Sequence, residues 1–127
     1  MTRSVRRVFD EHVAAVRDRD LDAIVAGYAA DAVLADSDRI GRGHDYIRAV
    51  HAATLDAAAG LDPAMEVFEL GEVVFVSWRA TRDDGPDLVG TNTFVVVDGV
   101  ITVNTAFMSP SSLAPIRLDH GLAATEV

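Results

Sequence analysis

The sequence contains no cysteine, which excludes disulfides, thiolate nucleophiles and zinc sites built on cysteine ligands. Positive charge is also scarce, because 11 Lys and Arg stand against 20 Asp and Glu, giving a net charge of −9. Such a surface repels a phosphate backbone, so no nucleic-acid partner is expected. No apolar run approaches the roughly 18 residues of a membrane span, so no membrane partner is expected either.

The N-terminal residues 1–4 lead directly into a charged segment without the apolar stretch of a signal peptide, so a cytoplasmic location is expected. Half of the 127 residues are apolar, which suffices for the core of a single domain over 1–127. Residues 109–127 have no clear periodicity and are expected to form a tail.

The first half of the chain has the spacing of amphipathic helices. Apolar residues recur every three or four positions from 5 to 16, with His12 inside the same stripe and Ser4 as the expected N-cap. A second helix is predicted to begin at Asp20 and to carry Tyr28 on its apolar face. A short strand over 32–35 and a third helix over 44–59 complete the prediction for this half.

The second half alternates with the period of strands, over 65–70, 73–81, 88–97 and 100–108. Asp98-Gly99 is typical of a two-residue type I′ hairpin. Three helices followed by an antiparallel meander predict an α+β domain with the helices on one face of the sheet.

The last hairpin predicts which side chains face the core. If Val97 pairs with Val100, regular pairing places Phe94 opposite Val103, Asn92 opposite Thr105 and Gly90 opposite Phe107. This face carries mostly large apolar side chains and is the expected core face. Asn92 is then a polar side chain among apolar neighbours, which requires a partner or a function.

His12, Asp36 and Asn92 are the candidate functional residues. Taken singly, each has a structural explanation, as a core histidine, a turn residue and a structural amide respectively. Together they would bring one carboxylate and two hydrogen-bond donors to one apolar cavity. His44 and His51 lie about 10.5 Å apart along a helix axis, too far to share one ion, so no metal site is expected.

Three segments resemble the nuclear transport factor 2-like (NTF2-like) superfamily: RDLDAIV at 19–25, YAADAV at 28–33, and Gly41-Arg42-Gly43 before a helix. That superfamily includes ketosteroid isomerases, SnoaL-like polyketide cyclases, scytalone dehydratase and limonene epoxide hydrolase. The resemblance covers about residues 5–108. It implies a cone-shaped, curved antiparallel sheet wrapped around three N-terminal helices, with one deep apolar pocket.

The ketosteroid isomerase branch matches best. This resemblance implies that Asp36 is the general base and that His12 stands at the position of the oxyanion-hole tyrosine. Asn92 stands at the position of the second donor, a protonated aspartic acid in the family. The histidine and the amide depart from the family pattern, and both can still donate a hydrogen bond.

The resemblance therefore implies an isomerase- or cyclase-like enzyme that moves a proton next to a carbonyl, without metal or organic cofactor. The expected partners are an apolar small molecule and a second copy of the chain, bound through the sheet. Two alternatives are a non-catalytic member that binds a hydrophobic ligand, and a dehydratase or epoxide hydrolase using Asp36 and His12. The expected substrate-binding wall consists of Tyr28, Trp78, Phe94, Val103, Thr105 and Phe107.

Overall fold

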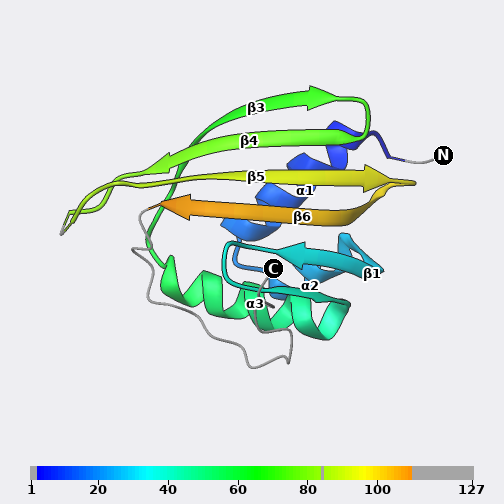
Figure 1. The fold of residues 1–127 in the computed structure, drawn as a ribbon, viewed down its shortest axis with the longest axis horizontal. Coiled ribbons are helices and arrows are strands. Elements are labelled where there is room, and N and C mark those ends of the chain that lie inside the picture. The colour runs from blue at the N-terminus through cyan, green and yellow to red at the C-terminus, as the bar shows by residue number, and fades with distance from the viewer. Residues whose placement is uncertain (1–2, 84, 110–127) are drawn as a thin grey trace, which may run out of the picture.

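Three helices cover one face of a curved six-stranded sheet in the computed structural model, which describes residues 3–83 and 85–109 (Figure 1). The elements are α1 (Val5–Arg17), α2 (Leu21–Ala26), β1 (Tyr28–Ala35), β2 (Ile40–Arg42), α3 (His44–Ala57), β3 (Ala64–Leu70), β4 (Val73–Ala80), β5 (Leu88–Val97) and β6 (Val100–Ser109). The strand order is β2-β1-β6-β5-β4-β3. Beyond Ser109, the expected tail lies outside the described residues.

The predicted α+β fold with a curved sheet is confirmed, with one correction to the strand directions. β1 runs parallel to β6, so the sheet is mixed rather than wholly antiparallel. Tyr28 does not belong to the second helix, which ends at Ala26; it begins β1 and pairs with Ile101. β2, which pairs with β1, was not predicted, because three residues are too short for a recognisable alternation.

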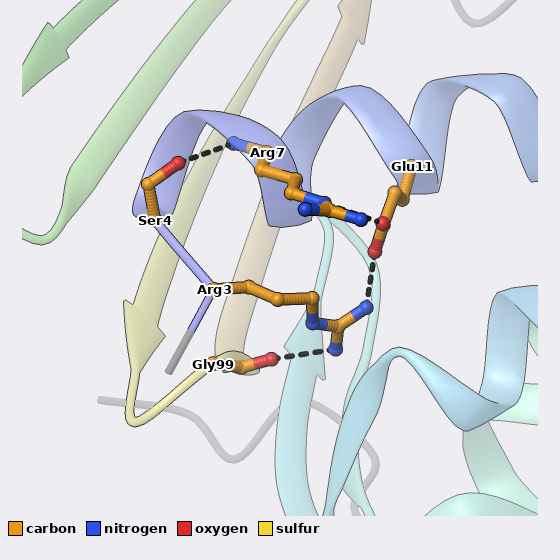
Figure 2. A network of polar contacts seen from close by, with 5 residues as sticks. All are labelled: Arg3, Ser4, Arg7, Glu11 and Gly99. Atoms are coloured by element: carbon orange, nitrogen blue, oxygen red, sulfur yellow. Dashed lines mark hydrogen bonds and ion pairs between the residues drawn. The ribbon is translucent and has the colours of Figure 1, made fainter. Parts of the chain in front are cut away.

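A polar network fixes the start of α1 (Figure 2). The Ser4 hydroxyl accepts a hydrogen bond from the backbone N–H of Arg7, as predicted for an N-cap. Glu11 pairs with both Arg3 and Arg7, and Arg3 also donates to the Gly99 carbonyl oxygen at 2.8 Å. These contacts join α1 to the turn between β5 and β6, so the apolar stripe of the helix faces the sheet.

The hairpin of β5 and β6 contains a β-bulge. Asp98 and Gly99 both have positive φ, as the predicted type I′ turn requires, and Val96 pairs with Ile101 as predicted. The next pair, however, is Val95 with Val103, so Thr102 is an extra residue in β6. Its hydroxyl donates to the carbonyl oxygen of Val95 at 3.2 Å, which gives that carbonyl a partner where the ladder is interrupted.

The bulge reverses the faces of the rest of β6. Phe94 pairs with Asn104 rather than Val103, and Asn104 is only 3% exposed. Val103, Thr105 and Phe107 therefore lie on the outer face of the sheet, so their predicted place on the core face is wrong. Phe107 lines a separate cleft there, together with Trp78 and Gly90. The physical reason is that side chains alternate with a period of two, so one inserted residue exchanges the two faces.

The outer face of the sheet carries exposed apolar side chains, among them Phe68, Phe75 and Phe107. It is the face where the expected homodimer would form, since Val95 and Val97 also lie there; the homodimer stays a prediction. None of the helices in the described ranges is long and apolar enough to span a membrane.

The bulge predicts opposite outcomes for two phenylalanines of neighbouring strands. Phe94→Ala should lower the free energy of unfolding by about 3–5 kcal/mol, because the ring is 4% exposed in the core. Phe107→Ala should cost less than about 1 kcal/mol, because that ring is 55% exposed. Urea denaturation in dilute solution measures both. Equal losses would contradict the bulged register.

Candidate functional site

A cavity of about 850 Å³ lies between α1, α3 and the inner face of the sheet. At its closed end it meets His12 on α1, His51 on α3, Asn92 on β5 and Asn104 on β6. Phe9, Val76, Trp78 and Phe94 contribute to its apolar wall. At its open end lie exposed side chains from the end of α1 and from the segment between α3 and β3. The arrangement is a cleft with an apolar wall, uncharged polar groups at the closed end and charged side chains at the open end.

Four hydrogen bonds join the polar groups into one line. Trp78 Nε1 donates to Asn92 Oδ1 at 3.0 Å, and Asn92 Nδ2 donates to Asn104 Oδ1 at 3.1 Å. Asn104 Nδ2 donates to the Tyr28 hydroxyl at 2.8 Å, which lies 2.9 Å from Nε2 of His51. Because indole N–H can only donate, the first three bonds run in the same direction, toward the Tyr28 oxygen. Nε2 of His51 is the only described partner for the proton of the buried hydroxyl, so the hydroxyl donates to Nε2 and the remaining proton of His51 is on Nδ1.

Burial keeps the line uncharged at neutral pH. Desolvation raises the pKa of Tyr28 well above its ordinary value, and the hydrogen bond from Asn104 opposes this only in part. Desolvation also lowers the pKa of His51 to about 4. Both rings are therefore neutral around pH 7.

His12 is the one side chain of the cluster with a buried nitrogen that has no partner. It is 8% exposed, packed 5.1 Å from the Phe94 ring and 5.7 Å from the His51 ring, between centroids. Its Nδ1 is buried without a hydrogen bond from any described residue. Desolvation, and then repulsion by His51, lower the pKa of His12 to about 3, so the ring is neutral.

The unpartnered atom decides the tautomer of His12. A buried N–H without an acceptor is costlier than a buried acceptor without a donor, so the proton belongs on Nε2. Since Nδ1 is shut off from solvent and the ring lines the cavity, Nε2–H is the polar group that His12 presents there.

The structure thus brings His12, Asn92, Trp78 and Phe94 together, but not Asp36. The Oδ1 of Asp36 accepts hydrogen bonds from the backbone N–H groups of Asp38 and Arg39, at 2.9 and 3.1 Å. Its Oδ2 lies 3.0 Å from Nε of Arg39. The carboxylate caps the turn between β1 and β2 and does not line the cavity. Tyr28 also lies outside the lining, and supports it through Asn104 and His51.

His51 and Asn104 were missed by the sequence interpretation. His51 follows Ile47 by four residues and is adjacent to Val50, so the helical spacing already placed it beside the apolar face of α3. The regular pairing predicted for the hairpin would place Asn104 on the outer face, because it does not include the bulge. Within 3–83 and 85–109, no three histidine or carboxylate side chains gather as a metal centre would.

Comparisons with known proteins identify the fold. No family model matches the sequence, and no curated protein matches it. Among solved structures, an NTF2-like protein of unknown function from Cytophaga hutchinsonii is 13% identical, with a TM-score of 0.71 and coverage of 87% of this chain and 94% of that one. The chain has the NTF2-like fold.

Two other structural neighbours have names that refer to chemistry. A candidate polyketide cyclase from Sinorhizobium meliloti is 24% identical, with a TM-score of 0.69 over 79% of this chain and 93% of that one. SalBIII, an epoxide hydrolase/cyclase-like enzyme with a role in pyran ring formation in the polyether salinomycin, is 19% identical. Its TM-score is 0.68, over 84% of this chain and 92% of its own. At these identities the likeness concerns the fold.

Gly90 positions the first donor of the line in this NTF2-like cavity. Trp78 and Gly90 are cross-strand partners, and the indole lies directly over the glycine. A Cβ atom built on Gly90 would lie 2.7 Å from Cε2 of Trp78 and 2.7 Å from the carbonyl oxygen of Phe107. Because the Phe107 carbonyl oxygen belongs to the backbone of the neighbouring strand, it cannot easily move away from the added Cβ. Any residue larger than glycine at position 90 must therefore displace the Trp78 indole.

Gly90→Ala should therefore move Trp78 away from Asn92 and cost about 1–3 kcal/mol of stability through overpacking. Trp78 is the only tryptophan, so its emission spectrum reports the displacement directly. Gly27→Ala is the matched control, because a Cβ there would meet no described atom closer than 3.5 Å. If both variants keep the wild-type spectrum, Gly90 has no positioning role.

The two histidines predict a loss of stability in acid. Their pKa values lie below the ordinary 6.5 in the folded state, so the unfolded chain binds protons more readily. The free energy of unfolding is therefore highest above pH 6.5. It falls as the pH decreases toward 4, the pKa of His51, and toward 3, the pKa of His12. Between pH 7 and pH 5, His12 alone should cost about 2 kcal/mol, and half-buried His51 should add less. Urea denaturation at both pH values tests this, and His12→Phe should flatten the dependence.

Proposed function

We propose that this NTF2-like protein binds an apolar small molecule through a carbonyl oxygen and stabilises negative charge on that oxygen, as a cofactor-free isomerase or cyclase does. One feature of the site supports this most directly: the closed end keeps two donors that the hydrogen-bond line does not use. Nε2–H of His12 and the second amide hydrogen of Asn92 have no acceptor of their own among the bonds described. A carbonyl or enolate oxygen supplies one.

Neutral histidine suits this role. With a pKa of about 3, His12 keeps a single donor proton at physiological pH and brings no fixed charge into an apolar cavity. A neutral imidazole can polarise a carbonyl while the ligand remains otherwise desolvated. Two preorganised donors on one oxygen form the electrostatic part of catalysis, and each typically contributes about 10²–10³ to the rate.

The position of Asp36 favours a second candidate, a non-catalytic binder. Its carboxylate already accepts three hydrogen bonds in the turn between β1 and β2, so it is not proposed as the base. Among the described residues that line the cavity, the only carboxylate is that of Asp62, at the open end. A protein that only binds its ligand needs the donors and no base. The two structural neighbours named for cyclase chemistry support the enzymatic candidate through their fold alone.

Binding is tested with two ligands of one shape, 2-acetylnaphthalene and 2-ethylnaphthalene, of which only the first has a carbonyl. Wild-type protein should bind the ketone roughly three- to tenfold more tightly, the value of one net hydrogen bond. His12→Phe keeps a ring in place and should remove this preference, whereas Asp36→Asn should keep it. Isothermal titration calorimetry measures the six affinities, two for each of the three proteins. A preference that survives in His12→Phe would rule out His12 as the carbonyl donor.

Turnover separates the enzyme from the binder. If the protein is an enzyme, a panel of unsaturated ketones and β-keto compounds should include a substrate. For that substrate, kcat should fall about 10²–10³-fold in His12→Phe and should also fall in Asn92→Leu, because each variant removes a donor. Asp36→Asn should retain near-wild-type kcat. Ketone binding without turnover of any panel member would favour the binder, and loss of activity only in Asp36→Asn would contradict the proposed site.

A further inference from the structure

The open end of the cavity carries cationic side chains, although the protein as a whole is acidic. Arg17, Arg19 and Asp62 line it there, so two guanidinium groups stand against one carboxylate. Arg17 Nε and Asp62 Oδ1 are 3.6 Å apart, a loose ion pair whose side chains are 56% and 83% exposed. Among the side chains that line the open end, cations thus outnumber carboxylates by one, in a chain of net charge −9, although Asp18 and Asp20 flank Arg19 in the sequence.

Arg19 stands at a backbone position that normally belongs to glycine. The N–H of Arg19 donates to Val16 O, and the N–H of Asp20 donates to Ala15 O, both at 3.0 Å. These two bonds form a Schellman motif at the end of α1, and its central residue requires a left-handed backbone. Arg19 accordingly has a φ of 57°, which costs stability for any residue with a Cβ. Stability alone would favour glycine there.

The guanidinium of Arg19 also differs from most arginines of the molecule. Arg3, Arg6, Arg7, Arg17, Arg39, Arg48 and Arg79 each pair with a carboxylate. Arg19 pairs with no carboxylate of the described residues, and it lines the cavity. Arg19 therefore combines an unfavourable backbone conformation with a guanidinium group that no described carboxylate pairs. It lies at the open end of the cavity, and the hydrogen-bond donors of His12 and Asn92 lie at the closed end.

From this arrangement we propose that the ligand is an apolar carboxylic acid that also carries a carbonyl group. This inference rests on the proposed function, because the carbonyl oxygen lies at His12 and Asn92 while the carboxylate lies at Arg19. A guanidinium group can donate two parallel N–H hydrogen bonds to one carboxylate, so arginine matches the geometry of a carboxylate better than other side chains do. The apolar body of the ligand fills the space along Val76 and Phe94.

The test uses flexible keto acids, 9-oxodecanoic and 11-oxododecanoic acid, and their methyl esters. Isothermal titration calorimetry at low salt gives each affinity, and the fluorescence of Trp78 confirms occupancy of the cavity. At least one acid should bind on the order of fivefold more tightly than its ester, as for a partly exposed ion pair. Arg19→Gln should abolish this difference without weakening the ester. Arg19→Gly should do the same while raising Tm, because glycine relieves the left-handed backbone.

Arg42→Gln is the matched control, since Arg42 lies on β2 and does not line the cavity, and it should leave the acid preference intact. Equal affinity of wild type for acids and esters, or a preference unchanged in Arg19→Gln, would overturn this inference and leave the proposed function standing. His12→Phe addresses the proposed function separately, because it should weaken acids and esters alike. Failure of wild type to bind any of the four probes would overturn both.

Discussion

The extra residue in β6 is the constraint on which the site depends. With the bulge at Thr102, Asn104 faces the cavity and can bridge Asn92 and Tyr28; regular pairing of the same sequence would instead place Val103 and Thr105 on that face. The amide line would then break in the middle, leaving Tyr28 and Asn92 each with an unsatisfied buried group. The hydroxyl of Thr102 stabilises the insertion by donating to Val95 O. The bulge in β6 thus determines which polar groups lie at the closed end of the cavity.

The hydrogen-bond line also explains how polar groups are tolerated in an apolar core. Each internal member of the line both donates and accepts, so the cost of removing it from water is offset by its neighbours. His12 is not part of the line, and its ring packs against those of Phe94 and His51. Its Nε2–H and the second amide hydrogen of Asn92 are the donors at the closed end that have no acceptor among the bonds described.

The sequence was sufficient for the fold and for part of the site. The helical stripe of α1 placed His12, and the alternation of β5 placed Asn92 and Phe94, because both patterns are local and regular. The predicted pairing of β5 with β6 is wrong beyond Ile101, because no local sequence pattern indicates the bulge at Thr102. The resemblance to the family predicted that Asp36 is the base in the cavity. In the structure the neighbouring Arg39 instead pairs with the Asp36 carboxylate in the turn between β1 and β2.

The parallel pairing of β1 with β6 has a consequence for folding. The first strand of the chain borders the last, and the hydrogen bond between Tyr28 and Asn104 joins residues 76 positions apart. During synthesis, α1, α2 and β1 must wait until nearly the whole domain has been made before the sheet can bury their apolar side chains. Closing so long a loop costs entropy before its contacts form, so assembly of the cavity floor belongs to a late and slow step of folding.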